Sequence, residues 1–163
     1  MLNPRLITDA IVAALAGIEA LAAAMTADDG NGNTVVRILA FHYQVGLDSQ
    51  LASAVYNMPT PSLLVAWDGS GPGQADGQTL WKHRFAVYFR MGTAVGQVAP
   101  VGYEDLWWLI CNGLPAGSPV NIRYMNLLDE LEIMDTPGAV HMVDEEQYDR
   151  FKGMFVIPEI GDN

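Results

Sequence analysis

The stretch PSLLVAWDGSGPGQADGQTLWKHRFAVYFRM, from Pro61 to Met91, decides the fold. Its first arm, Leu63 to Trp67, is a short unbroken apolar run that is typical of a strand buried on both faces. Its second arm alternates between two faces, which is the period of a half-buried strand. One face would carry Trp81, His83, Phe85, Val87 and Phe89, and the other Lys82, Arg84, Ala86, Tyr88 and Arg90. The stretch therefore predicts a long antiparallel β-hairpin.

The segment between the two arms has the composition of a loop. It runs from Gly69 to Thr79 and contains four glycines, one proline and no large apolar side chain. Such a segment cannot bury enough apolar surface to offset the entropy of ordering it. We therefore expect an exposed, mobile tip. The candidate docking loop consists of Gly69, Ser70, Gly71, Pro72, Gly73, Gln74, Ala75, Asp76 and Gly77.

The chain before the hairpin predicts two helices and one strand. Asn3 followed by Pro4 is a typical helix start, and apolar residues recur at spacings of three and four over residues 7–25. This pattern predicts one helix of roughly five or six turns. β-branched and aromatic residues predict a strand over residues 34–43, and a short helix is expected over residues 48–56.

The chain after the hairpin predicts one further helix and several strands. The helix is expected over residues 102–113, because acidic residues occupy its first turn and a glycine ends it. Residues 121–135 are mixed and fit strands or a short turn of helix. The last strand is expected over residues 148–157, with Gly153 marking a bulge.

Taken together, these elements predict an α+β fold. Strands outnumber helices, and hairpin links outnumber crossover connections. We expect a single domain over residues 1–163, with a mainly antiparallel sheet, a long β-hairpin and helices packed on one face.

The composition restricts the function. The net charge of −11 argues against a nucleic-acid binder that relies on phosphate contacts. Half of the residues are hydrophobic and only 17% are charged, so the chain has more apolar surface to hide than a typical monomer, and an oligomer could hide it. Cys111 is the single cysteine, which excludes an internal disulfide and fits a reducing compartment. Glu19 interrupts the apolar N-terminal run, so neither a signal peptide nor a membrane span is expected.

No catalytic, cofactor-binding or metal-binding residue is predicted. Cys111 lies on an apolar helix and His83 on the apolar face of a strand, so both fit structural roles. The glycine-rich tip lacks the ending of a P-loop and lies between two strands. Two acidic clusters, at 129–132 and 144–146, could hold Mg²⁺ or Ca²⁺, but they lack EF-hand spacing and fit a solvated surface better. The chain is therefore not expected to be an enzyme.

Four residues are candidates for a contact between subunits. Lys82, Arg84 and Arg90 form a basic strip on the polar face of the second arm, which fits either a solvated strand face or a partner with a negative patch. Trp107 and Trp108 diverge by about 100° on a helix, so one of them points away from the core. Trp108 is the candidate for a contact with another subunit.

The hairpin stretch, the helix YEDLWWLICNGL and the closing strand FKGMFVIPEIG together resemble small tail proteins of bacteriophages. The likeness is to the tail terminator or tail-completion group, including the Gp37-like minor tail proteins of Mu-type phages. It covers most of the chain in order. Residues 136–143 and the tryptophan pair depart from the family pattern, which leaves the assembly role open.

The resemblance implies a structural, non-enzymatic part of the virion that assembles in the host cytoplasm. Terminators form rings, commonly hexamers, that cap the tail tube and face the head connector. The tip at residues 69–77 would be a docking loop. Part of the negative charge would line a lumen through which DNA slides without sticking. No cofactor and no membrane contact are implied.

Two other functions remain open. The −11 charge also fits a small acidic cytoplasmic binding or adaptor module, similar to an immunity protein, that blocks a basic partner. An enzyme that uses an acidic cluster and a metal is the weaker alternative.

Overall fold

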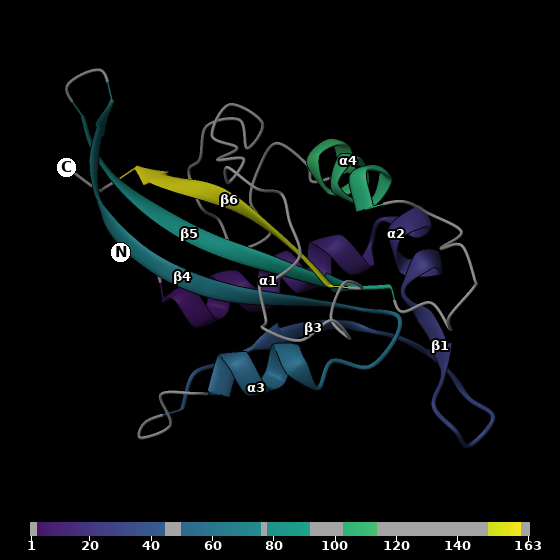
Figure 1. Cartoon of the computed structure of the whole chain (residues 1–163). Helices are drawn as coiled ribbons and strands as arrows, with labels where there is room; N and C mark the ends of the chain where they lie inside the picture. The colour runs from purple at the N-terminus through teal and green to yellow at the C-terminus, as the bar shows by residue number, and fades with distance from the viewer. Residues whose placement is uncertain (1–2, 45–49, 76–77, 92–102, 114–149, 161–163) are drawn as a thin grey trace.

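The computed structural model describes residues 3–44, 50–75, 78–91, 103–113 and 150–160. Within them the chain folds as α+β, as predicted, around a four-stranded sheet in the order β3-β4-β5-β6 (Figure 1). The β3–β4 pairing is parallel, and the β4–β5 and β5–β6 pairings are antiparallel. β1 and β2 form a separate antiparallel pair. The elements are α1 (Pro4–Ala16), α2 (Glu19–Ala24), β1 (Thr26–Asp28), β2 (Thr34–Val36), β3 (Ile38–Phe41), α3 (Gln50–Tyr56), β4 (Ser62–Ala75), β5 (Gln78–Arg90), α4 (Tyr103–Gly113) and β6 (Arg150–Ile160).

The long hairpin is confirmed, but the expectation of a mobile tip is wrong for residues 69–75. These residues belong to β4, and the ladder runs without interruption from the pair Gly69–Arg84 to the pair Ala75–Gln78. Glycine weakens a strand without forbidding it, and β5 is already held on its other side by β6 as far as Leu80. The glycine-rich composition predicted a loop, but these residues form a strand because β5 is available to pair with them. Residues 76 and 77 lie outside the described residues.

The two borders of the sheet carry prolines. Leu63 donates its N–H to the carbonyl of Arg37, on the side of β4 away from β5, at 2.8 Å. β3 pairs with this side of β4 only as far as Ala66, so beyond that residue it is a border of the sheet. With the register shift at Asp68, Pro72 points to this border, and Pro158, opposite Lys82, points to the border formed by β6. Proline has no N–H to donate, and such border positions are where sheets tolerate it.

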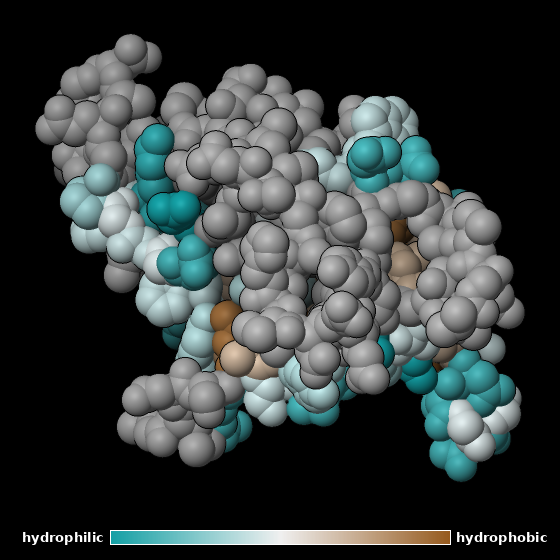
Figure 2. Space-filling model, viewed as in Figure 1, coloured by the Kyte–Doolittle hydropathy of each residue, from teal (hydrophilic) through white to brown (hydrophobic). Residues whose placement is uncertain are grey.

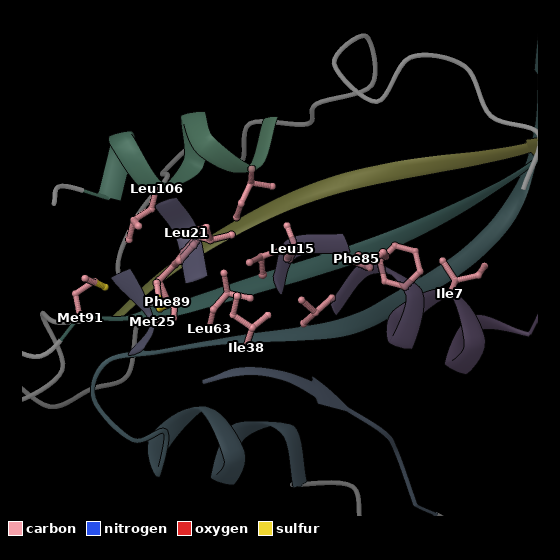
Figure 3. Close-up of a cluster of buried hydrophobic side chains, with 14 residues drawn as sticks. Ile7, Leu15, Leu21, Met25, Ile38, Leu63, Phe85, Phe89, Met91 and Leu106 are labelled. Carbon is pink, nitrogen blue, oxygen red and sulfur yellow. The ribbon is translucent and has the colours of Figure 1, made fainter. Parts of the chain in front are cut away.

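One face of the sheet packs against α1, α2 and α4. Figure 3 shows the side chains of this cluster converging between the helices and the strands. The alternating arm supplies Phe85, Val87 and Phe89 as predicted, and the helices supply Ile7, Leu15, Leu21 and Leu106, all of them almost fully buried. Burying large apolar side chains in this way is the main source of stability for the domain.

The opposite face is covered by α3. Ala86 and Tyr88, which the sequence placed on the polar face of β5, are buried there with Val55 and Met58. The helices α1, α2 and α4 thus share one face as expected, whereas α3, which was expected on the same face, covers the other (Figure 1). The apolar character of β4 agrees with this arrangement, because a strand covered on both faces reads as an unbroken apolar run.

Two predicted elements are divided in the structure. The long N-terminal helix starts at Pro4 with Asn3 as its cap, but it ends at Ala16, and the extended backbone of Ile18 (φ −82°, ψ 103°) separates α1 from α2. Glycine at position 17 favours this break, since it is among the weakest helix formers. The apolar spacing continues across the break because both helices face the same core.

The predicted strand over residues 34–43 is also two elements, because the backbone of Arg37 changes partners. Its N–H donates to Met25 at 2.9 Å, and its carbonyl accepts from Leu63 at 2.8 Å. β2 therefore pairs with β1, and β3 pairs with β4. The short helix, the helix after the hairpin and the last strand are found close to their predicted bounds. The predictions for residues 121–135 lie outside the described residues.

Candidate functional site

The hairpin shifts its register at Asp68. Trp67 faces Phe85 and Gly69 faces Arg84, so Asp68 is an extra residue in the β4–β5 ladder. A bulge of this kind moves the inside–outside alternation of a strand by one residue. Gly69 takes a φ of 118°, which strongly favours glycine. We call the part beyond this bulge, β4 residues 69–75 and β5 residues 78–84, the distal arm.

The bulge brings three polar groups together on the face of the main core. The indole Nε1–H of Trp67 donates to Ser70 Oγ at 2.9 Å, and Ser70 Oγ lies 2.6 Å from His83 Nδ1. An indole N–H can only donate, so Ser70 accepts there, and its hydroxyl keeps one hydrogen and one lone pair for the contact with His83. The side chain of His83 is fully buried, in agreement with the structural role predicted for it.

A basic face lies on the other side of the distal arm. Lys82 faces Gly71 and Arg84 faces Gly69, so no β4 side chain stands directly opposite either cation. Arg84 is exposed and Lys82 is half-buried. A Cβ at either glycine would meet nothing within 4 Å, so this surface has low relief. We call Lys82, Arg84 and the two glycines the basic face.

Asp68 influences two tyrosines beside the basic face. Burial raises the pKa of Tyr88 to about 12, and the charges of Asp68 and of ionised Tyr43 add to this effect. Burial and Asp68 also raise the pKa of Tyr43. The ring of Tyr43 meets Phe41 edge-on, with centroids 4.9 Å apart. Both phenols therefore stay neutral near pH 7, and the negative charge at this corner belongs to Asp68.

The third predicted member of the basic strip lies farther along the same face of β5. Arg90 faces Ser62 at the opposite end of β5, and its guanidinium donates to the carbonyl of Met58. Ala86 and Tyr88 lie between Arg84 and Arg90 on the same face, and both are buried under α3. The structure thus brings Lys82 and Arg84 together and separates Arg90 from them, because α3 covers the middle of the strip.

The tryptophan pair diverges as predicted. Trp107 packs against the core cluster and meets Phe89 edge-on, with ring centroids 6.3 Å apart. Trp108 points away and is 63% exposed. The predicted bulge at Gly153 is wrong: this residue pairs regularly with Val87, and it is glycine because the Trp107 ring lies directly over it.

The remaining candidates supply no second site in the described residues. His42 Nε2 lies 2.7 Å from Asp9 Oδ1 and links the end of β3 to α1. No group of three or more His, Cys, Asp or Glu side chains that could hold a metal occurs among these residues. The side chain of Cys111 and the acidic clusters at 129–132 and 144–146 lie outside the described part.

A scan against protein-family models and a search of curated proteins find no match for this chain. No helix in the described part of the chain is long and apolar enough to cross a bilayer.

The Trp67–Ser70–His83 relay, the hydrogen-bonded chain of these three side chains, is the feature that sequence reasoning missed. Its only signal is a serine in a glycine-rich segment, and it requires the bulge, which alternation alone does not predict.

Proposed function

We propose that this chain is a structural subunit that associates with copies of itself, and that the distal arm is its docking element. The observation that carries the proposal is the length of the hairpin beyond β3. β3 accompanies β4 only as far as Ala66, whereas β4 continues to Ala75. Among the described side chains, neither hydrophobic cluster includes one beyond Trp67 on β4 or before Phe85 on β5, although His83 is buried at the base of the arm.

The construction of the arm supports this proposal. A two-stranded ribbon alone is marginally stable in water, but β6 runs beside β5 as far as the pair Leu80–Ile160. The Trp67–Ser70–His83 relay fixes the side chains at the base of the arm. An element that is held in one conformation loses little entropy on binding. Exposed Trp108 offers a second contact, since tryptophan is enriched at protein interfaces.

We further propose that the assembly is a tail or neck ring of a bacteriophage, of the terminator or tail-completion type. The support is the resemblance of the hairpin, the tryptophan helix and the closing strand to that group. A ring of subunits with a charge of −11 each would present a negative lumen to DNA. The tail tube and head connector would be its neighbours. This assignment predicts that genes beside the coding sequence encode other tail or head-connector proteins.

A shortened hairpin tests the docking role. Deleting residues 72–75 and 78–81 joins Gly71 to Asp76 and Gly77 to Lys82, which keeps the alternation and an Asp-Gly connection of the kind that favours hairpins. Light scattering across a concentration series should show oligomers for the wild type and monomers for this variant, with both folded by circular dichroism.

Two results would contradict the proposal. A wild-type chain that stays monomeric at millimolar concentration has no self-association to explain, and a monomer that captures a basic protein favours the acidic adaptor function instead. A shortened variant that assembles like the wild type assigns the contact to another surface.

A further inference from the structure

The strand β3 forms one border of the four-stranded sheet (Figure 1). The carbonyl of Arg37, just before this strand, accepts a hydrogen bond from Leu63 of β4. In a parallel ladder, every second residue of a strand bonds to the neighbouring strand, and the residues between them face the other way. The backbone N–H and C=O groups of Ile38 and Ala40 therefore point away from β4, toward the border.

These outward groups have no hydrogen-bond partner in the part of the chain that the structure describes. β3 contains no proline, whereas Pro72 and Pro158 each remove a donor from the distal part of β4 and from β6. A row of unpaired strand donors and acceptors is a template for a further strand. The segment of the border formed by β3 is therefore open to strand addition where the two proline-bearing segments are protected.

Apolar side chains flank the open backbone on the face that α3 covers. Leu39 is 39% exposed, and Phe41 packs at the rim of the cluster beneath α3. A strand added at the border would lie about 4.8 Å from β3 and would place alternate side chains beside these two. Figure 2 shows the hydrophobic residues among those it colours only in small areas, so that face offers no broad apolar patch as a competing site.

Two carboxylates lie near the end of β3. Asp9 Oδ1 lies 2.7 Å from His42 Nε2. Asp68 lies close enough to Tyr43 to raise its pKa, in addition to the larger effect of burial. Arg84 lies on β5, one strand farther from the border than Asp68 on β4. An incoming strand with a basic residue fits this border, and β3 of a second copy does not, since it contains no basic residue.

We propose that the border at β3 binds an extended segment of another protein by strand addition, and that this segment carries apolar side chains and a basic residue. The backbone of Ile38 and Ala40 supplies the hydrogen bonds, Leu39 supplies an apolar contact and Asp68 supplies the charge. Main-chain hydrogen bonds give affinity in this mode of recognition, and side chains give specificity. The site is separate from the distal arm and goes beyond the proposed self-association.

A short peptide of alternating valine and threonine with a lysine at each end is the probe, and fluorescence anisotropy measures its binding to the full chain. Ala40→Pro removes an outward donor at a position where sheets tolerate proline, and should weaken binding about tenfold or more. Ala40→Ser keeps the donor and should bind within about twofold of the wild type. Asp68→Asn should weaken binding of the lysine peptide about two- to fivefold and leave a peptide with glutamine ends unaffected.

Amide hydrogen exchange followed by NMR tests the border without a mutation, so it also serves if Ala40→Pro fails to fold. In the free chain, the amide protons of Ile38 and Ala40 should exchange faster than those of Leu39 and Phe41, which bond to β4. Saturating peptide should slow exchange at Ile38 and Ala40 about tenfold or more, and should leave Leu39 and Phe41 unchanged.

Four results would overturn the inference. The first is a lysine peptide that does not bind at millimolar concentration. The second is protection of Ile38 and Ala40 in the free chain, which means that the border is already covered. The third is binding that survives Ala40→Pro or leaves both amides unprotected, which places the contact elsewhere. The fourth is loss of self-association in Ala40→Pro, which assigns the border to a second copy.

This inference and the proposed self-association fail separately. The shortened hairpin variant lacks the end of the distal arm but keeps β3, so it should be monomeric and bind the peptide within about twofold of the wild type. A wild type that stays monomeric but binds the peptide removes the proposed function alone. A wild type that assembles but ignores the peptide removes this inference alone.

Discussion

Replacing Gly153 by alanine tests how α4 packs on the sheet. A Cβ at this position would lie within 2.7 Å of Trp107 Cε3 and Cη2, and closer still to Cζ3, which is shorter than real contacts allow. The indole must shift, although it packs on the core cluster and against Phe89. Forcing an extra carbon into a packed site costs about 1–3 kcal/mol.

A second effect acts in the opposite direction. Alanine is favoured over glycine inside a strand by about 0.5–1 kcal/mol, because the unfolded chain loses less entropy on folding. We therefore expect Gly153→Ala to lower the free energy of unfolding by about 1–2 kcal/mol. For a domain of this size, that loss lowers the melting temperature by roughly 2–8 °C.

The measurement is urea unfolding followed by tryptophan fluorescence and by circular dichroism. Gly71→Ala is the matched control, since its Cβ meets nothing within 4 Å and its φ is not in the left-handed region. It should leave stability unchanged or slightly higher. In the background of Trp107→Leu, alanine at 153 should lose most of its cost, and this coupling isolates the contact. A Gly153→Ala protein as stable as the wild type would show that the indole does not lie on β6.

The relay and the buried tyrosine give two further predictions. Ser70→Ala leaves the indole N–H of Trp67 and Nδ1 of His83 without the serine, and should cost about 1–3 kcal/mol in the free energy of unfolding, whereas a cost below 0.5 kcal/mol would mean that water replaces the hydroxyl. The pKa of Tyr88 is raised to about 12 from an ordinary value near 10, so its stabilising contribution is complete below pH 10 and is lost as pH rises from 10 to 12. Tyr88→Phe should flatten the unfolding free energy across that range, and an unchanged slope would place the titration in another group.

The sequence predicted those parts of the fold in which a local pattern and the final environment agree. The hairpin, the Asn3 cap, α4 and β6 are such cases, since alternation, capping chemistry and helical spacing all survive in the folded protein. The glycine-rich composition of residues 69–75 predicted a loop, whereas pairing with β5 stabilises a strand there. The apolar spacing from α1 to α2 predicted one helix and gave no sign of the break at Gly17. Such errors arise where a tertiary partner outweighs a local preference.

Only part of the candidate site could be predicted from the sequence. Lys82 and Arg84 were found by alternation, because no element interrupts β5 between them. Arg90 lies on the same face of β5 as predicted, but alternation does not show that α3 covers Tyr88 between Arg90 and Arg84. The Trp67–Ser70–His83 relay depends on one extra residue at Asp68, and a one-residue shift is the kind of feature that a periodic pattern cannot predict.

The prolines at the borders of the sheet bear on how this protein behaves when it is crowded. An uninterrupted row of outward donors invites further strands, and the end product of that reaction is amyloid. Pro72 and Pro158 each remove a donor at nearly the same level of opposite borders. Each proline interrupts the row of donors on its border, so it weakens strand pairing between copies of the chain there and favours contacts made through side chains when the protein is concentrated.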